Sequence, residues 1–454
     1  MSKQLSLTEG NILSSLTRFA MPVLLALFLQ ALYGGIDLLI VGRFAETADV
    51  SGVATGSMVM HTITMIITGL SVGITVLVGQ RIGEGKPDEA GKAIGSGICF
   101  FGTVTVVLTI LIFFGSDALS EFMHAPEEAF RQTSIYIKIC GAGSVFFIAY
   151  NVIGSIFRGL GDSKTPLITV AIACIFNIAG DLLLVAVFNM GAAGAAAATV
   201  FSQAISVLIS LIIITKRQQP FEFSREYLRF DKELIMTEFK LGSPVALQEL
   251  LVGLSFLVIQ MIVNSIGVTA SAGVGVAEKL CTFVMLVPSA YAQSMTAFVA
   301  QNAGARKPER ALKGLFYGIA TSVAVGLVVG YAAFFHGDIL SSFFSGESDV
   351  IAASHSYLKS YAVDCLLTPF LFCFIGYFNG YGRTLFVMIQ GLVGAFCVRI
   401  PVAFFVSRLP GATLFHIGLA TPASTVVQII LCLLMMHRLK KKGFYSAFLP
   451  NSDN

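Results

Sequence analysis

The sequence predicts an all-α membrane protein with twelve transmembrane helices, arranged as two parallel six-helix repeats. Three observations support this prediction. Hydrophobic residues make up 56% of the 454 residues and charged residues only 12%, a composition that a water-soluble fold could not bury. Twelve apolar runs reach the length of roughly 20 residues that a membrane-spanning helix needs. A motif of eleven residues also occurs twice, 221 residues apart.

The apolar runs carry few or no charges and divide evenly between the two halves of the chain. Because six spans return the chain to its starting side, the two repeats have the same topology and are related by an axis along the membrane normal. The predicted spans are residues 19–42, 50–79, 93–115, 134–157, 166–188, 192–215, 241–266, 270–300, 314–335, 356–378, 385–407 and 413–436.

The duplicated motif relates the two halves, and eleven charges in the 25 residues from Lys216 to Lys240 mark the boundary between them. It begins at Gln80 and returns at Gln301, with Gln, Gly, Lys, Pro and Ala in register. The same offset relates Gly-Leu-Gly at 159–161 to Gly-Tyr-Gly at 380–382, so the register holds across each half. The expected domains are an amino-terminal six-helix lobe at 1–215, a cytoplasmic linker at 216–240, a carboxyl-terminal six-helix lobe at 241–437 and a basic cytoplasmic tail at 438–454.

The distribution of Lys and Arg predicts the orientation. If both termini are cytoplasmic, 22 of the 29 Lys and Arg residues lie on the cytoplasmic side, five lie outside, and Lys279 and Arg399 lie within spans. This imbalance follows the positive-inside rule. We therefore expect a monomeric, multi-pass protein of the cell membrane, surrounded by lipid and without a nucleic-acid partner.

The catalytic signatures in the sequence fail when their context is considered. Gly-Leu-Ser-Val-Gly at 69–73 matches the nucleophile-elbow pattern, but it lies in an apolar helix without a nearby His. Small residues at this spacing predict close helix packing instead. The Gly-rich stretch at 79–86 lacks the spacing of a phosphate loop, and neither the six His nor the eight Cys show metal-ligand spacing. We expect neither an enzyme nor a bound cofactor.

Ionisable side chains within spans are costly in lipid and mark candidate functional sites. They are Asp37, Asp181, Glu249, Glu278, Lys279, Asp364 and Arg399. In three spans of the first half, polar residues share one helical face, since they are spaced by four or seven positions. These residues are Gln30 with Asp37, Asn177 with Asp181, and Thr199 with Gln203.

Two carboxylates with amide and hydroxyl oxygens suit either a hard cation or a shared proton. A structural hydrogen-bond network is the alternative reading of the same residues. It is disfavoured because the second half has no comparable set: position 402, aligned with Asp181, is Val.

Several sequence segments together resemble the multidrug and toxic compound extrusion (MATE) transporters. These segments are Met21-Pro22, Gln30 to Tyr33, Asp37 with Val41-Gly42-Arg43, the duplicated motif, and Arg158 to Pro166. The resemblance covers essentially the full chain and points to the DinF-like and related bacterial branches. It implies two six-helix lobes around a cleft, and export of amphipathic, often cationic compounds in exchange for protons or sodium.

The resemblance also implies roles for individual residues. Asp37, Asn177, Asp181 and Thr199 are expected to couple the movement of a proton or cation to export of the substrate. In a sodium-coupled protein these four residues would be the metal ligands. Supporting or substrate-cleft roles are expected for Gln30, Asn151, Gln203, Glu249, Asp364 and, from its position within a span, Glu278. Glu249 and Asp364 lie about one turn from the spacing of a second cation site found in some members, so such a site stays open. Pro22 is expected to allow bending of the helix that carries Asp37.

Other functions remain as alternatives. A lipid or polysaccharide flippase of the same superfamily would be favoured by further helices and by a cluster of Arg or Lys that holds phosphates. Here Lys279 and Arg399 are the cationic residues within the predicted spans. A membrane enzyme and a channel are weaker alternatives. The sequence leaves open the substrate and the choice between protons and sodium.

Overall fold

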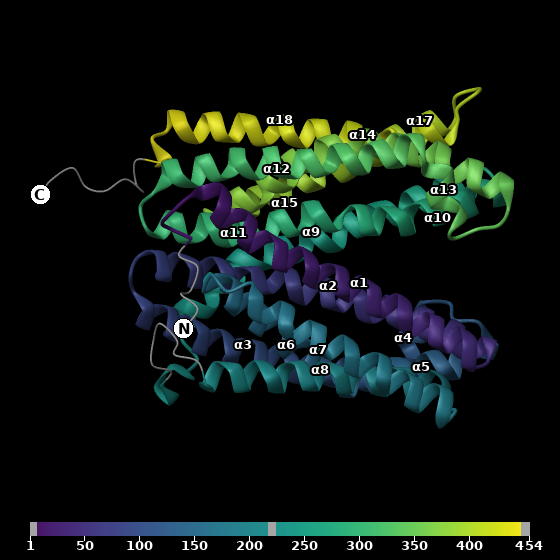
Figure 1. Ribbon diagram of the computed structural model, residues 1–454, viewed down its shortest axis with the longest axis horizontal. Coiled ribbons are helices and arrows are strands. Elements are labelled where there is room, and N and C mark those ends of the chain that lie inside the picture. The colour runs from purple at the N-terminus through teal and green to yellow at the C-terminus, as the bar shows by residue number, and fades with distance from the viewer. Residues whose placement is uncertain (1–6, 217–223, 446–454) are drawn as a thin grey trace, which may run out of the picture. The chain divides into compact units, whose positions relative to one another are not determined.

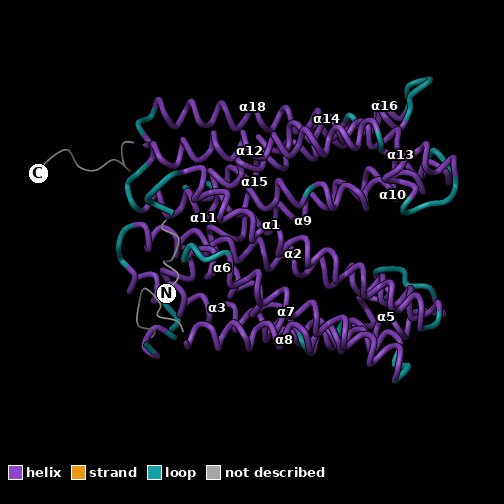
Figure 2. The backbone as a smooth tube through the Cα atoms, viewed as in Figure 1, coloured by secondary structure: helices purple, strands orange, loops and turns teal. Residues whose placement is uncertain are grey.

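The computed structural model describes residues 7–216 and 224–445 of the chain. All regular secondary structure in these residues is helical, as Figure 2 shows, which confirms the predicted fold class. Residues 217–223 of the predicted linker and 446–454 of the predicted tail lie outside the described residues.

The helices of the first half follow the order of the predicted spans (Figure 1). They are α1 (Ile12–Phe44), α2 (Thr47–Gly83), α3 (Pro87–Phe114), α4 (Ser116–Phe122), α5 (Glu127–Ala142), α6 (Ser144–Gly159), α7 (Lys164–Asp181), the π-helix η1 (Leu182–Val187) and α8 (Gly191–Lys216).

A 3-10 turn, η2 (Arg225–Tyr227), precedes the helices of the second half. These are α9 (Lys232–Asn264), α10 (Val268–Val284), α11 (Leu286–Gly304), α12 (Pro308–Phe335), α13 (Gly337–Ser342), α14 (Ser348–Gly380), α15 (Thr384–Leu392), the π-helix η3 (Val393–Arg399), α16 (Ile400–Ser407), α17 (Leu414–Gly418) and α18 (Ala420–Lys441).

Eleven segments among the described residues are long and apolar enough to cross a membrane, or twelve if one bent pair is counted as a span. The bent pair, α5 and α6, stands where one continuous span at 134–157 was predicted, and its two helices meet at Gly143 with a bend of 54°. A side chain at Gly143 would collide with Val200 of α8, since its Cβ would lie 2.4 Å from Val200 Cγ1.

The offset of 221 residues relates the helices of the two halves. Both ends of α3 correspond to both ends of α12. The first residue of α2 corresponds to the first residue of α10, and the last residue of α6 corresponds to the last residue of α14. The two halves differ in where these long segments break. The first half breaks at Gly143, between α5 and α6, whereas the second half breaks at Met285, between α10 and α11.

The chain divides into two compact units that share α1 and α9. The amino-terminal unit contains Met21–Ala246, and the carboxyl-terminal unit contains Ser6–Ala20 and Leu247–Asn454. The first turns of α1 thus belong to the carboxyl-terminal unit, and the first turns of α9 to the amino-terminal unit. Pro22 and Pro244 lie beside these division points, and α1 and α9 continue as helices through them.

The first turns of α9 pack closely on α2 within the amino-terminal unit. A Cβ atom at Gly73 would lie 2.2 Å from the carbonyl oxygen of Glu238, and one at Gly69 would lie 2.7 Å from Cα of Ala246. From the other side, a Cβ atom at Gly242 would lie 2.0 Å from the carbonyl oxygen of Leu70. This geometry confirms that the small residues at 69–73 allow close helix packing.

The close packing buries part of the predicted cytoplasmic linker. Glu238 falls within the expected linker at 216–240, but its side chain is only 1% exposed because α9 already begins at Lys232. The Cβ position of Gly97 on α3 lies 3.0 Å from the Glu238 carboxyl oxygen Oε2. The last part of this segment is therefore a packed helix.

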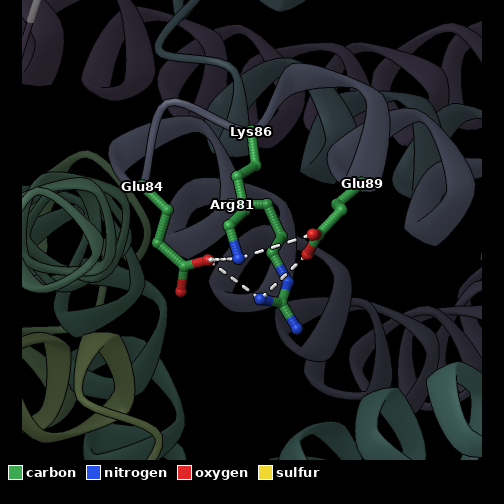
Figure 3. Close-up of polar contacts among 4 residues, drawn as sticks. All are labelled: Arg81, Glu84, Lys86 and Glu89. Atoms are coloured by element: carbon green, nitrogen blue, oxygen red, sulfur yellow. Dashed lines mark hydrogen bonds and ion pairs between the residues drawn. The ribbon is translucent and has the colours of Figure 1, made fainter.

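The first copy of the duplicated motif forms the turn between α2 and α3. Arg81 Nη1 lies 2.9 Å from Glu84 and 3.1 Å from Glu89, and Lys86 Nζ lies 3.6 and 3.4 Å from the same carboxylates. Figure 3 shows the four side chains around one another. Because they are partly exposed, these ion pairs order the turn with little effect on global stability.

In the second copy of the motif, side chains donate hydrogen bonds to backbone carbonyls instead of pairing with carboxylates. At the position that corresponds to Glu89, the second half has Arg310, whose guanidinium donates to the carbonyls of Leu7, Glu9 and Gly10 at 3.2, 2.6 and 2.7 Å. Asn302 donates to the Leu7 carbonyl at 3.1 Å. The reversed charge therefore anchors the segment before α1 within the carboxyl-terminal unit.

Candidate functional site

The four residues expected to couple transport to a cation come together inside the amino-terminal unit. Asp37 lies on α1, Asn177 and Asp181 lie on α7, and Thr199 lies on α8. All four are buried, and Asn177 and Asp181 are completely inaccessible to solvent. The Thr199 hydroxyl oxygen connects the helices: it lies 3.1 Å from Asp37 Oδ2 and 3.5 Å from Asn177 Nδ2.

The Thr199 hydroxyl has one proton but two acceptors within reach, Asp37 Oδ2 at 3.1 Å and the Ala195 carbonyl oxygen at 2.9 Å. If the proton points to Asp37, it stabilises the ionised carboxylate. If it points to Ala195, the Thr199 oxygen can accept a bond from a protonated Asp37 or contribute an oxygen ligand to a cation. The hydroxyl can therefore serve both charge states of the site.

Several oxygen atoms of the site lack a hydrogen-bond donor among the described residues. They are Oδ1 of Asp37, Oδ1 of Asn177 and both carboxyl oxygens of Asp181. A buried acceptor without a partner costs about 1–3 kcal/mol, so these atoms favour a bound proton or cation. Carboxylate, amide and hydroxyl oxygens are also the ligand types that hard cations use.

The carboxyl groups of Asp37 and Asp181 are within hydrogen-bonding reach of each other. Two ionised carboxylates can only repel, whereas a pair that holds one proton between them forms a hydrogen bond. Binding of a proton to one of the two groups therefore depends on the charge of the other. A proton or a monovalent cation changes the net charge of this buried cluster by one.

Gln203 supports the site through a residue that the sequence reasoning missed. Its amide nitrogen donates to the Tyr33 hydroxyl at 3.2 Å. Tyr33 lies one turn before Asp37 on α1, and Gln203 lies one turn after Thr199 on α8. The pair joins the two helices beside the carboxyl cluster. The spacing of four residues between Tyr33 and Asp37 is the sequence signal that could have identified this partner.

The other two supporting residues of the amino-terminal unit bind elsewhere. Gln30 donates from Nε2 to the Tyr150 hydroxyl at 2.9 Å. The amide oxygen of Asn151 accepts from the Thr68 hydroxyl at 2.9 Å, and its nitrogen donates to the Phe147 carbonyl at 2.8 Å. Gln30 and Asn151 therefore cross-link helices of the unit, and neither makes a hydrogen bond to the four residues expected to couple transport.

Helix α7 changes geometry directly after Asp181. The next six residues, Leu182–Val187, form the π-helix η1, and the Phe188 amide donates to the Leu183 carbonyl at 3.0 Å. Such π-helical turns are rare in proteins, and those that do occur are often found at functional sites. No pattern in the sequence predicts this change, since Leu-Leu-Leu-Val-Ala-Val is an ordinary apolar run.

The carboxyl-terminal unit has no copy of the cluster at the equivalent positions. The offset of 221 residues places Val258, Val398, Val402 and Ala420 where the first half has Asp37, Asn177, Asp181 and Thr199. All four replacements are apolar. The predicted acidic residues of this unit lie elsewhere, with Glu249 on α9, Glu278 on α10 and Asp364 on α14.

Comparisons with known proteins cover both halves of the chain. The family model described as MatE matches residues 22–183 and 244–405. "Probable multidrug resistance protein YpnP" of Bacillus subtilis is 30% identical over 424 residues, which are 91% of this chain and 90% of that protein. "Multidrug export protein MepA" of Staphylococcus saprophyticus is 23% identical over 412 residues, or 89% of each chain.

The fold also matches solved structures. The structure described as "Crystal structure of MATE in complex with MaL6" covers 99% of both chains with a TM-score of 0.91 at 20% identity. The structure described as "Crystal structure of MATE in the bent conformation" covers 98% of this chain with the same TM-score and 20% identity.

A duplicated bundle of helices that are long and apolar enough to span a membrane defines a multi-pass membrane protein. The family model matches well over half of the chain, and a relative shares 30% identity over nearly its whole length. The chain therefore belongs to the MATE family, and it is a transporter rather than an enzyme.

Proposed function

We propose that this protein exports amphipathic, often cationic compounds across the cell membrane in exchange for protons or sodium. The observation that carries the proposal is the buried cluster of Asp37, Asn177, Asp181 and Thr199, whose oxygen atoms lack donors. Ionisable groups at such depth are costly, so they favour a role in ion or proton movement.

The cluster couples transport through a change in charge. A ligand shifts a conformational equilibrium only by its different affinity for the two states. A proton or sodium ion bound between Asp37 and Asp181 neutralises one carboxylate and stabilises the state in which the cluster is dehydrated. Its release to water favours the other state, and alternating access of the two lobes follows. Pro22 allows α1, which carries Asp37, to change shape during this step.

The class of substrate rests on the relatives and on composition. Both curated relatives are named as multidrug resistance or export proteins. The chain contains 38 Phe and 14 Met, side chains that adapt to apolar ligands of different shapes. A lipid or polysaccharide flippase is not favoured by these relatives.

The proposed export can be tested in bacterial cells that lack their own efflux pumps. Cells that express the protein should expel ethidium, a cationic dye, faster than cells with an empty vector, and they should tolerate higher concentrations of it. Equal efflux and equal tolerance for a panel of cationic and neutral amphipathic compounds would contradict the proposal.

We further propose that the protein acts as a monomer with both termini in the cytoplasm. Glu127, at the start of α5, would then face the outside, and Glu226, before α9, would face the cytoplasm. A Cys at position 127 should react with an impermeant maleimide in intact cells, and a Cys at 226 only after permeabilisation, both in a variant without the exposed Cys397. Labelling at 226 in intact cells would reverse this topology.

A further inference from the structure

The carboxyl-terminal unit buries a cationic side chain at the end of a π-helix. Arg399 is the last residue of η3 and is only 6% exposed. Its Nη1 donates to the Ser255 hydroxyl at 3.0 Å, and its guanidinium lies 4.3 Å from the centroid of the Phe256 ring. The Nε atom has no hydrogen-bond partner among the described residues. Stacking on an aromatic ring offsets part of the cost of burying this charge.

The buried carboxyl group of Asp364 lies near Arg399 without forming a direct ion pair, and the partly buried carboxyl group of Glu278 lies near Tyr357. Asp364 is 1% exposed and close enough for its charge to interact with that of Arg399. Glu278 and Arg399 both lie within electrostatic range of Tyr357. In the described part of the chain, no carboxylate oxygen lies within the ion-pair limit of 4.0 Å from the guanidinium. The charge of Arg399 thus acts on Asp364 over a longer distance than that of a direct ion pair.

Each of the two carboxyl groups has an oxygen atom without a hydrogen-bond partner within the described ranges. Oδ1 of Asp364 and Oε1 of Glu278 are buried and have no hydrogen-bond partner among the described residues. Charges in a low-dielectric interior interact strongly even when they do not form a direct ion pair. The charge of Arg399 therefore compensates that of Asp364.

The repeat places this charge beside the position of a coupling residue. Arg399 corresponds to Ile178 at the offset of 221, and Ile178 directly follows Asn177 on α7. The same helix of the repeat therefore supplies cation ligands in the amino-terminal unit and a cation in the carboxyl-terminal unit. The positions of the four coupling residues are apolar in the second copy.

We propose that Arg399 is a built-in cation that neutralises Asp364 from within, so that the carboxyl-terminal unit binds no exchangeable cation. This inference rests on the proposed function, because it assigns cation exchange to the amino-terminal unit alone. It makes Arg399 the residue that sets how many cations are exchanged per substrate molecule.

The exchange ratio of purified protein in liposomes tests this inference. The ratio is obtained from the reversal potential of ethidium transport under imposed proton and sodium gradients. Arg399→Gln leaves Asp364 without its cation, and the ratio should rise by about one cation per ethidium. Arg399→Lys should keep the ratio of the wild type. Arg399→Gln combined with Asp364→Asn restores the net charge of the region and should restore the ratio.

Arg408→Gln is the matched control, since Arg408 also lies over an aromatic ring, Phe404, at 4.0 Å but is exposed. It should leave the exchange ratio unchanged. An active Arg399→Gln variant with the ratio of the wild type would overturn the inference, and so would a change in the ratio caused by Arg399→Lys.

Thermal unfolding in detergent tests the same inference without transport. Arg399→Gln should lower the unfolding temperature, and the added Asp364→Asn change, or an excess of the coupling cation, should recover much of the loss. A destabilised Arg399→Gln variant that neither treatment rescues would overturn the inference. If the wild type exchanges no cation at all, the proposed function fails, whereas this stability comparison still decides the role of Arg399.

Discussion

Replacing Asp37 or Asp181 by Asn is expected to reduce ethidium efflux to the background of cells without the protein. An amide keeps the shape of the side chain but cannot bind and release a proton, and it is a weaker cation ligand than a carboxylate. Both side chains are buried in one cluster, so neither can replace the other in a pair that acts as a unit. The measurement is the efflux rate from energised cells, normalised to the amount of protein in the membrane.

The matched control for these substitutions is Asp338→Asn, at an exposed position on α13. It removes an equal charge outside the cluster and should leave efflux unchanged. The variants of Asp37 and Asp181 should also purify as single species, since each removes a charge from a buried site. Efflux at the rate of the wild type in both variants would remove the coupling role of the cluster.

Replacing Gly73 by Val is expected to prevent most of the protein from folding. The new Cβ would lie 2.2 Å from the carbonyl oxygen of Glu238, and a backbone atom inside a helix cannot rotate away as a side chain can. Overpacking in a close-packed interior costs about 1–3 kcal/mol, occasionally more. We expect a loss at the upper end of this range, measured as a lower unfolding temperature and a smaller monodisperse fraction after purification.

Gly102→Val is the control for this prediction. Gly102 lies exposed on α3, and its Cβ position has no atom within 4 Å. The variant should purify like the wild type. If Gly73→Val had the same unfolding temperature as Gly102→Val, the close packing of α9 on α2 would not hold in the folded protein.

Fold and repeat could be predicted because they depend on patterns within the sequence. Long uncharged runs mark membrane spans, and the fixed offset between Gln80 and Gln301 relates the two halves. The spacing of four residues between Asn177 and Asp181 places both on one face of α7. That face meets Asp37 and Thr199 in the structure. Helical spacing therefore placed these residues among the candidates, and the resemblance to the MATE family singled them out.

Features that depend on contacts between distant segments could not be predicted in this way. Glu238 stands in a charged stretch that suggests a solvated linker, yet glycines of α2 and α3 leave room for α9 to bury it. Gly143, where α5 and α6 meet, lies close to Val200, a contact with a residue remote in the sequence. The π-helix after Asp181 has no local signature. The role of Arg399 required the side-chain contacts of the carboxyl-terminal unit.

Cation-coupled export by the Asp37 and Asp181 cluster is tested most directly by flux measurements with purified protein in liposomes. An outward ethidium gradient should drive protons or sodium ions in the opposite direction, with each cation varied separately. The wild type should couple the two flows with a fixed ratio, and Asp37→Asn and Asp181→Asn should abolish the cation flow. Ethidium transport that moves neither cation, or coupled flow that persists in both variants, would contradict this mechanism.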